Sequence, residues 1–139
     1  EQVSNYITEL EIGNNKCNAE SITELDLSKY PLLKNVTIGD ESFMYVSVFN
    51  ITGLSELESV EIGMNSFTQH KNWFGKDPNR HFYLKNCPKL KSLKMGRYSF
   101  SDYYVIGIEN VDALEEIEMG DYSFYYASLE LKSILIHSE

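Results

Sequence analysis

Residues 57–67 are Leu-Glu-Ser-Val-Glu-Ile-Gly-Met-Asn-Ser-Phe, and close copies of this stretch recur along the chain. The other copies are ITELEIGNNKC from Ile7, LKNVTIGDESF from Leu33, LKSLKMGRYSF from Leu90 and LEEIEMGDYSF from Leu114. A truncated copy, LKSILIH, begins at Leu131. Repetition of one motif at intervals of this size is typical of proteins built by stacking coils. The repeat therefore predicts a solenoid in which each copy contributes one coil.

The apolar residues before each glycine alternate with polar ones. In the third copy Val60 and Ile62 flank Glu61, which is the period of a half-buried strand. A single coil cannot bury its apolar edge, so we expect the copies to stack as a parallel sheet with strands ~4.8 Å apart. The aromatic residue that ends four of the copies is expected to fill the core: Phe43, Phe67, Phe100 and Phe124.

A second alternating segment lies between the copies, at 48–51, 82–84, 106–108 and 129–131. Its β-branched and aromatic residues favour extended structure over helix. We therefore expect short strands or turns on the convex face, opposite a concave parallel sheet, with little helix. Residues 1–139 are expected to form one domain of about five full repeats and a partial one, with an inserted loop at about 69–80.

The frame resembles the leucine-rich repeat LxxLxLxxNxL, which maps onto Leu57, Val60, Ile62, Asn65 and Phe67. Three other copies differ, placing Glu41, Tyr98 and Tyr122 at the Asn position. The IG-x-x-SF ending is also similar to the BspA-type branch, whose units carry IG-x-x-AF. The resemblance implies a leucine-rich-repeat solenoid that binds other macromolecules on its concave sheet. It does not identify the partner.

The composition narrows the classes of partner. A net charge of −9 disfavours nucleic acid and anionic membranes, which need clustered Lys and Arg. No apolar run approaches the roughly 18 residues of a membrane span, so we expect no membrane insertion. Cys17 and Cys87 are too few for a disulfide framework and occupy apolar positions of the repeat, so both are expected to be buried free thiols.

Charged residues alternate outward along the predicted strands. The candidates for partner binding are Glu11, Glu61, Lys94, Arg97 and Glu118. A surface that is acidic at both ends, with two cations near its middle, would suit a basic partner. The alternative is an ordinary solvated sheet face.

The period is interrupted at residues 69–80, which contain the only tryptophan, Trp73, and a Gly-Lys-Asp-Pro turn signal. Insertions in solenoids form edge loops that often bind partners, so Trp73 is a further candidate contact. Alternatively, Trp73 folds back to cover a neighbouring coil. Tyrosines also crowd the last two full coils, where they either anchor a partner or pack between coils: Tyr98, Tyr103, Tyr104, Tyr122, Tyr125 and Tyr126.

Asn35 and Asn50 each begin an N-glycosylation sequon, and Asn50 is expected to face solvent because it alternates with Phe49 and Ile51. No catalytic motif, phosphate-binding loop or metal-ligand spacing is present, so we expect no enzyme activity and no cofactor. A calcium site among Asp40, Glu41 and Asp121 is a minor alternative.

Two functions remain open at this stage. The first is a non-enzymatic module that binds a protein, or less favourably a glycan, through the concave sheet and the Trp73 loop. The second is a structural segment that self-associates end to end through uncapped ends into a filament or longer array. We lean toward an extracellular or cell-surface setting, and the sequons would matter only in a secretory context.

Overall fold

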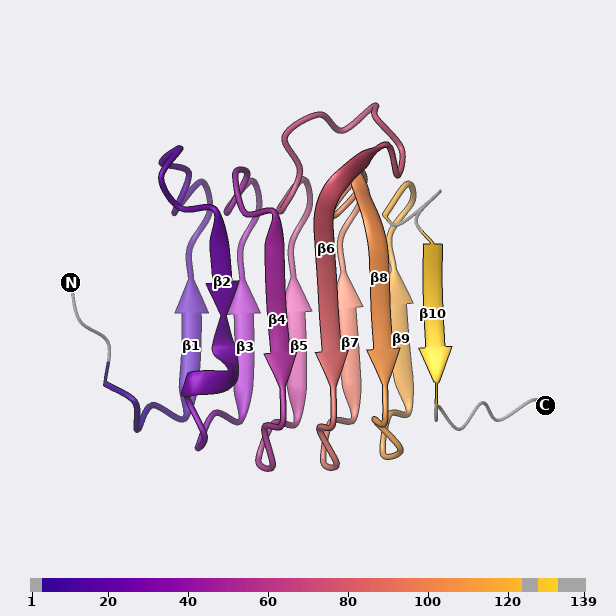
Figure 1. The fold of residues 1–139 in the computed structure, drawn as a ribbon. Helices are drawn as coiled ribbons and strands as arrows, with labels where there is room; N and C mark the ends of the chain where they lie inside the picture. The colour runs from indigo at the N-terminus through magenta and orange to yellow at the C-terminus, as the bar shows by residue number, and fades with distance from the viewer. Residues whose placement is uncertain (1–3, 124–127, 133–139) are drawn as a thin grey trace.

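The structure is a computed structural model, and it describes residues 4–123 and the strand at 128–132 (Figure 1). Some residues predicted above lie outside these ranges, namely Phe124, Tyr125, Tyr126 and the part of the truncated copy after Lys132. The described residues form a mostly β solenoid of about five turns, as the repeat predicts. Two parallel sheets face each other across one core.

The first sheet, sheet A, contains one four-residue strand from each copy of the repeat. Its strands lie in the order β1-β3-β5-β7-β9. They are β1 (Glu9–Ile12), β3 (Asn35–Ile38), β5 (Ser59–Ile62), β7 (Ser92–Met95) and β9 (Glu116–Met119). Neighbouring strands pair in parallel with equivalent residues opposite each other, so Glu61 lies between Thr37 and Lys94. The strands end at the residue before each repeat glycine, as predicted.

The segments between the copies form a second complete sheet, sheet B. Its strands lie in the order β10-β8-β6-β4-β2 and all pair in parallel. They are β2 (Glu24–Asp26), β4 (Val48–Thr52), β6 (Asp77–Lys85), β8 (Tyr103–Glu109) and β10 (Ser128–Lys132). The expectation of extended segments is confirmed, but the alternative of turns is wrong. Strand β2 was not predicted, although Leu25 and Leu27 flank Asp26 with the same alternation as the other segments.

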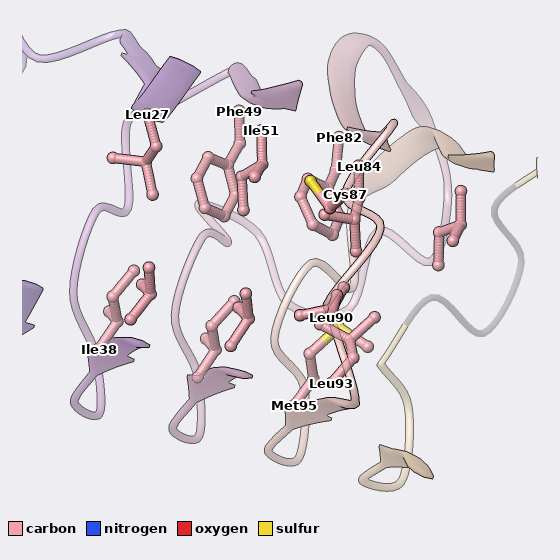
Figure 2. Packing of buried hydrophobic residues seen from close by; sticks show 14 of the residues in the cluster. Leu27, Ile38, Phe49, Ile51, Phe82, Leu84, Cys87, Leu90, Leu93 and Met95 are labelled. Carbon is pink, nitrogen blue, oxygen red and sulfur yellow. The ribbon is translucent and has the colours of Figure 1, made fainter. Parts of the chain in front are cut away.

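Phenylalanine rings connect the two sheets inside the core. Phe67, which follows sheet A, stacks on Phe49 of sheet B with ring centroids 4.6 Å apart, and on Phe43 and Phe100 in the neighbouring coils at 5.2 and 4.6 Å. Figure 2 shows Phe49 and Phe82 in successive coils above the aliphatic side chains of sheet A. The core role predicted for Phe43, Phe67 and Phe100 is confirmed by their burial.

The turns after sheet A explain the glycine and the serine of the repeat. A Cβ atom on Gly96 would lie 2.6 Å from backbone atoms of Gly63 and Met64 in the preceding coil, so only glycine fits this spacing. The buried Ser66 hydroxyl donates to the Gly39 carbonyl at 2.7 Å and accepts the Ser42 N–H at 3.1 Å. The serine therefore satisfies two buried backbone groups of the previous coil, which an alanine at this position could not do.

The inserted segment is shorter than predicted. Asp77 to Arg80 belong to β6, so the Gly-Lys-Asp-Pro turn assignment is wrong for Asp77 and Pro78. The loop spans 69–76, and the pairing of β6 with β8 is irregular between Asp77 and His81. Most of the extra length is thus absorbed as a longer strand and a loop at one edge (Figure 1).

Two smaller expectations need correction. Leu131 and Lys132 end strand β10 of sheet B, whereas the repeat frame placed them at the start of a sixth copy. Cys17 and Cys87 are both free, as predicted. However, only Cys87 is buried, because Cys17 lies in the first coil and has no coil before it among the described residues.

Candidate functional site

The outer face of sheet A carries the predicted charged residues in two rows that run across the strands. One row is Glu9, Asn35, Ser59, Ser92 and Glu116, and the other is Glu11, Thr37, Glu61, Lys94 and Glu118. These two rows contain five carboxylates and a single lysine. A shallow groove of about 400 Å³ crosses this face, with Glu61, Lys94 and Glu118 in its lining.

Lys94 does not form a positive centre on this face. Its Nζ lies 3.7 Å from the Glu116 carboxylate and 4.0 Å from that of Glu118, and the lysine is half-buried. The two glutamates therefore neutralise it, and the face remains acidic overall. Glu11 lies on β1, three strands away from Lys94, so it belongs to the same row but not to the groove.

The loop at 69–76 rises beyond the carboxyl ends of the sheet A strands (Figure 1). Trp73 is 50% exposed and stacks on His70 of the same loop, with ring centroids 4.1 Å apart. The Lys71 Nζ lies 5.4 Å from the centre of the Tyr98 ring, and the Phe74 ring lies 5.6 Å from that of Tyr122. The loop therefore rests on the turn tyrosines, and half of the Trp73 surface stays open to solvent.

Arg97 joins the groove to this loop. It follows Gly96 in the turn after β7, and its guanidinium lies 5.3 Å from the Tyr98 ring and 5.9 Å from the Tyr122 ring. Those two rings stack on each other at 5.0 Å. The structure thus brings Arg97 and the loop together at one edge of sheet A, next to the groove that holds Glu61, Lys94 and Glu118.

A buried ion pair at the base of the loop was missed by the sequence analysis. Arg80 and Asp102 are almost fully buried, with Nε and Oδ1 3.3 Å apart. The other carboxylate oxygen of Asp102 accepts the backbone N–H groups of Gln69 and His70 at 3.0 and 3.1 Å. The Asp102 carbonyl accepts the Asp77 N–H at 3.1 Å, so this one residue holds both ends of the loop. In the sequence, the only indication of this buried pair is that Arg80 lies at the end of the insertion.

The tyrosines of the last two full coils differ in burial. Tyr103 is fully buried and donates from its hydroxyl to the Val46 carbonyl at 2.6 Å, and burial raises the pKa of its phenol. Tyr104 and Tyr122 remain exposed by 46% and 38%, respectively. The packing role therefore applies to Tyr103, whereas Tyr98 and Tyr122 line the turn edge.

The two sequon asparagines lie in strands and point to the outside of the sheets, but both are half-buried and hydrogen-bonded. Asn35 donates to Glu9 at 2.9 Å and accepts from Ser59 at 2.6 Å. Asn50 accepts from Thr52 at 2.7 Å and lines a shallow groove on sheet B with Tyr83 and Lys85.

Within residues 4–123 and 128–132, no three His, Cys, Asp or Glu side chains come together in a way that could hold a metal ion. The same residues include no helix with the length and apolar character of a membrane span. Comparison with family models, with curated proteins and with solved structures found no match to this chain.

Proposed function

We propose that the protein is a non-enzymatic binding module of the leucine-rich-repeat type, which recognises a protein partner through the outer face of sheet A and the Trp73 loop. The repeat frame coincides with the strands and turns of sheet A, which supports the family proposal. The protein differs from the usual leucine-rich repeat in one respect. In that repeat a helix or 3₁₀ segment usually accompanies each strand, whereas here the corresponding segments form a second sheet.

The observation that carries the proposal is the charge of the sheet A face. Five carboxylates point outward from its strands, and the one lysine among them is already paired with two glutamates. Such a face attracts a basic segment over distances of about 10 Å at moderate salt and repels an acidic one. The exposed side of Trp73 adds an aromatic anchor beside the acidic groove.

The electrostatic part is tested with a fluorescent lysine-rich peptide and a glutamate-rich peptide of the same length. We expect the protein to bind only the lysine-rich peptide, with an affinity that falls as salt rises. Glu61→Lys should weaken binding about tenfold, whereas Glu24→Lys, the same change on the exposed side of sheet B, should not. Equal binding by both variants, measured by fluorescence anisotropy, would show that sheet A is not the docking face.

The role of the loop is tested separately with Trp73→Ala. Because Trp73 is half-exposed and packs mainly on His70, this change should leave the melting temperature nearly unchanged. A protein partner that uses the loop should bind several-fold more weakly. Unchanged affinity for a partner that is sensitive to Glu61→Lys would remove the loop from the proposed surface.

A second candidate function is end-to-end assembly. Ile117 and Met119 of β9 face the core side of sheet A, yet each is 38% exposed. Strand β9 is the last strand of sheet A among the described residues, and exposed apolar side chains there favour contact with another coil. If copies assemble in this way, sedimentation should depend on concentration, and Met119→Lys should abolish the dependence. Met64→Lys, at an exposed methionine away from the ends, should not. A parent protein that stays monomeric at high concentration contradicts this candidate.

The proposal extends to glycosylation of Asn50 and Asn35 in a protein exposed at the cell surface or outside the cell. The outward orientation of both side chains supports it. Mass spectrometry of peptides from protein produced in its native cells tests it, and unmodified asparagines at both positions would contradict it.

A further inference from the structure

A polar groove of about 250 Å³ lies along the turn edge of the first three coils, beside the Trp73 loop. Its polar lining includes Asn15, Asn18, Glu41, Asn65, Gln69 and Lys71. It differs from the sheet A groove in composition and place, because carboxamides dominate and none of its lining residues belongs to a strand. It therefore goes beyond the proposed docking face.

The backbone gives this groove its regular spacing. Asn15, Glu41 and Asn65 occupy the same position of successive turns, with φ of 54°, 56° and 58°. In this left-handed conformation, the three side chains project from the turns at equivalent points, about one strand spacing apart. The next two copies have Tyr98 and Tyr122 at this position, so the polar groove ends where the tyrosines begin.

Hydrogen bonds among the wall residues fix the positions of their side chains before any ligand binds. Asn18 donates to Asn15 Oδ1 at 3.0 Å and to the Glu41 carbonyl at 2.8 Å, and its Oδ1 accepts the Met44 N–H at 2.9 Å. Asn18 is thereby held in place, and the Oδ1 of Asn15 is occupied. The amide nitrogen of Asn15 remains as the hydrogen-bonding group that can serve a ligand.

The other wall residues leave a mixed set of donors and one acceptor. The Oδ1 of Asn65 is buried and finds no donor among the described residues, and its carboxamide is part of the groove wall. The Oε1 of Gln69 accepts from Arg80 at 3.4 Å, which leaves its nitrogen to donate. The carboxylate of Glu41, exposed at the turn, supplies the acceptor.

We propose that this turn-edge groove binds a neutral carbohydrate. A sugar hydroxyl can donate one hydrogen bond and accept two, so adjacent hydroxyls match a lining in which amide donors flank a carboxylate. The single carboxylate of Glu41 and the single ammonium of Lys71 give the lining no net charge, which favours a neutral ligand over a charged one. An apolar ligand would leave the carboxamides unpaired. The regular spacing of the three turn residues suits a chain of sugar units that lies across the coils.

The test uses the full chain with four soluble probes: maltohexaose, cellohexaose, chitohexaose and mannohexaose. Saturation-transfer NMR and calorimetric titration should detect binding of at least one of them in the millimolar range or tighter. Glu41→Gln should weaken that binding about tenfold, because it replaces the charged acceptor by a neutral amide of the same size.

Asn65→Gly provides the second variant, because glycine tolerates a φ of 58° and removes the carboxamide together with its unpaired oxygen. Asn86→Gly is the matched control, since Asn86 has a φ of 56° in a turn of the opposite edge. We expect Asn65→Gly to lose binding and Asn86→Gly to retain it, with melting temperatures close to that of the parent.

Three outcomes would overturn the proposal: no binding of any of the four probes, equal loss in Asn65→Gly and Asn86→Gly, or unchanged binding in Glu41→Gln and Asn65→Gly. The result is independent of the docking proposal, because the lysine-rich peptide experiment reports on sheet A and not on these turns.

Discussion

The five strands of sheet A have four residues each, whereas the strands of sheet B range from three to nine. Both sheets belong to the same coils and share the same core, so stacking alone does not explain the difference. At the ends of β3, β5, β7 and β9 the glycines approach the backbone of the preceding coil closely. The buried serines Ser42, Ser66 and Ser99 bond across the same junctions. These contacts leave no room for an extra residue. Sheet B lacks such a junction, so β6 can be longer than its neighbours, and the rest of the insertion forms the loop at 69–76.

The buried pair on the sheet B side gives the largest expected effect. Asp102→Ala removes the carboxylate that faces Arg80 and that accepts two N–H groups of the loop. An uncompensated buried arginine should lower the free energy of unfolding by about 3–5 kcal/mol. Asp121→Ala, at an exposed aspartate, should change it little. Denaturant unfolding compares the two variants, and similar losses would mean that the pair does not hold the loop and β6.

Two glycines test the junction directly, one in each sheet. Gly96→Ala places its Cβ 2.6 Å from backbone atoms of the preceding coil, and overpacking of this kind should cost about 3 kcal/mol. Gly107→Ala in sheet B meets the Tyr83 ring at 3.1 Å and the Lys85 side chain at 3.9 Å, and it should cost about 1 kcal/mol, since these side chains can move. Equal unfolding free energies for the two variants would contradict the proposed difference between the sheets.

The serine of the repeat should have a smaller effect. Ser66→Ala leaves the Ser42 N–H and the Gly39 carbonyl unpaired in a buried place, with an expected loss of about 2 kcal/mol in unfolding free energy. Ser55→Ala is the control, because Ser55 is exposed and contacts only the Glu56 side chain at 3.3 Å. If thermal unfolding gives both variants an unfolding free energy within a few tenths of a kcal/mol of that of the parent, the serine contacts do not stabilise the stack.

The smallest expected effect concerns the two thiols. It is a difference in their rates of alkylation and not a change in the stability of the protein. Burial raises the pKa of both Cys17 and Cys87, so the reactive thiolate is scarce at neutral pH and increases as pH rises. Cys17, half-buried after β1, should be alkylated before Cys87, which is fully buried after β6. Mass spectrometry of a timed iodoacetamide reaction measures the order, and faster labelling of Cys87 would mean that the sheet B side opens more readily.

The strands of sheet A could be located from the sequence to the residue because their signal is local. Val60, Ile62 and Gly63 together define where a strand runs and where it must end, and the other full copies have equivalent residues. Strand β6 was predicted only in part, since Pro78 and the neighbouring polar residues are typical of turns. The pairing of β6 with β8 overrides that local preference.

The candidate site was predicted in the same uneven way. Glu61, Lys94 and Glu118 were expected on one face because alternation and register place them there, and they line one groove. The neutralisation of Lys94, by contrast, depends on glutamates of the next strand. The turn-edge groove was missed altogether, because Asn65 was assigned only to the repeat frame.

The sequence by itself determined the coil, its strand on sheet A, the glycine and serine junction, and the phenylalanine core, because these follow from a period that each copy carries within itself. Only the tertiary structure decided that Arg80 meets Asp102, that Lys71 rests on Tyr98 and that Asn15, Glu41 and Asn65 form one groove wall. These groups belong to different coils, and their contacts depend on stacking geometry that a pattern within one coil does not contain.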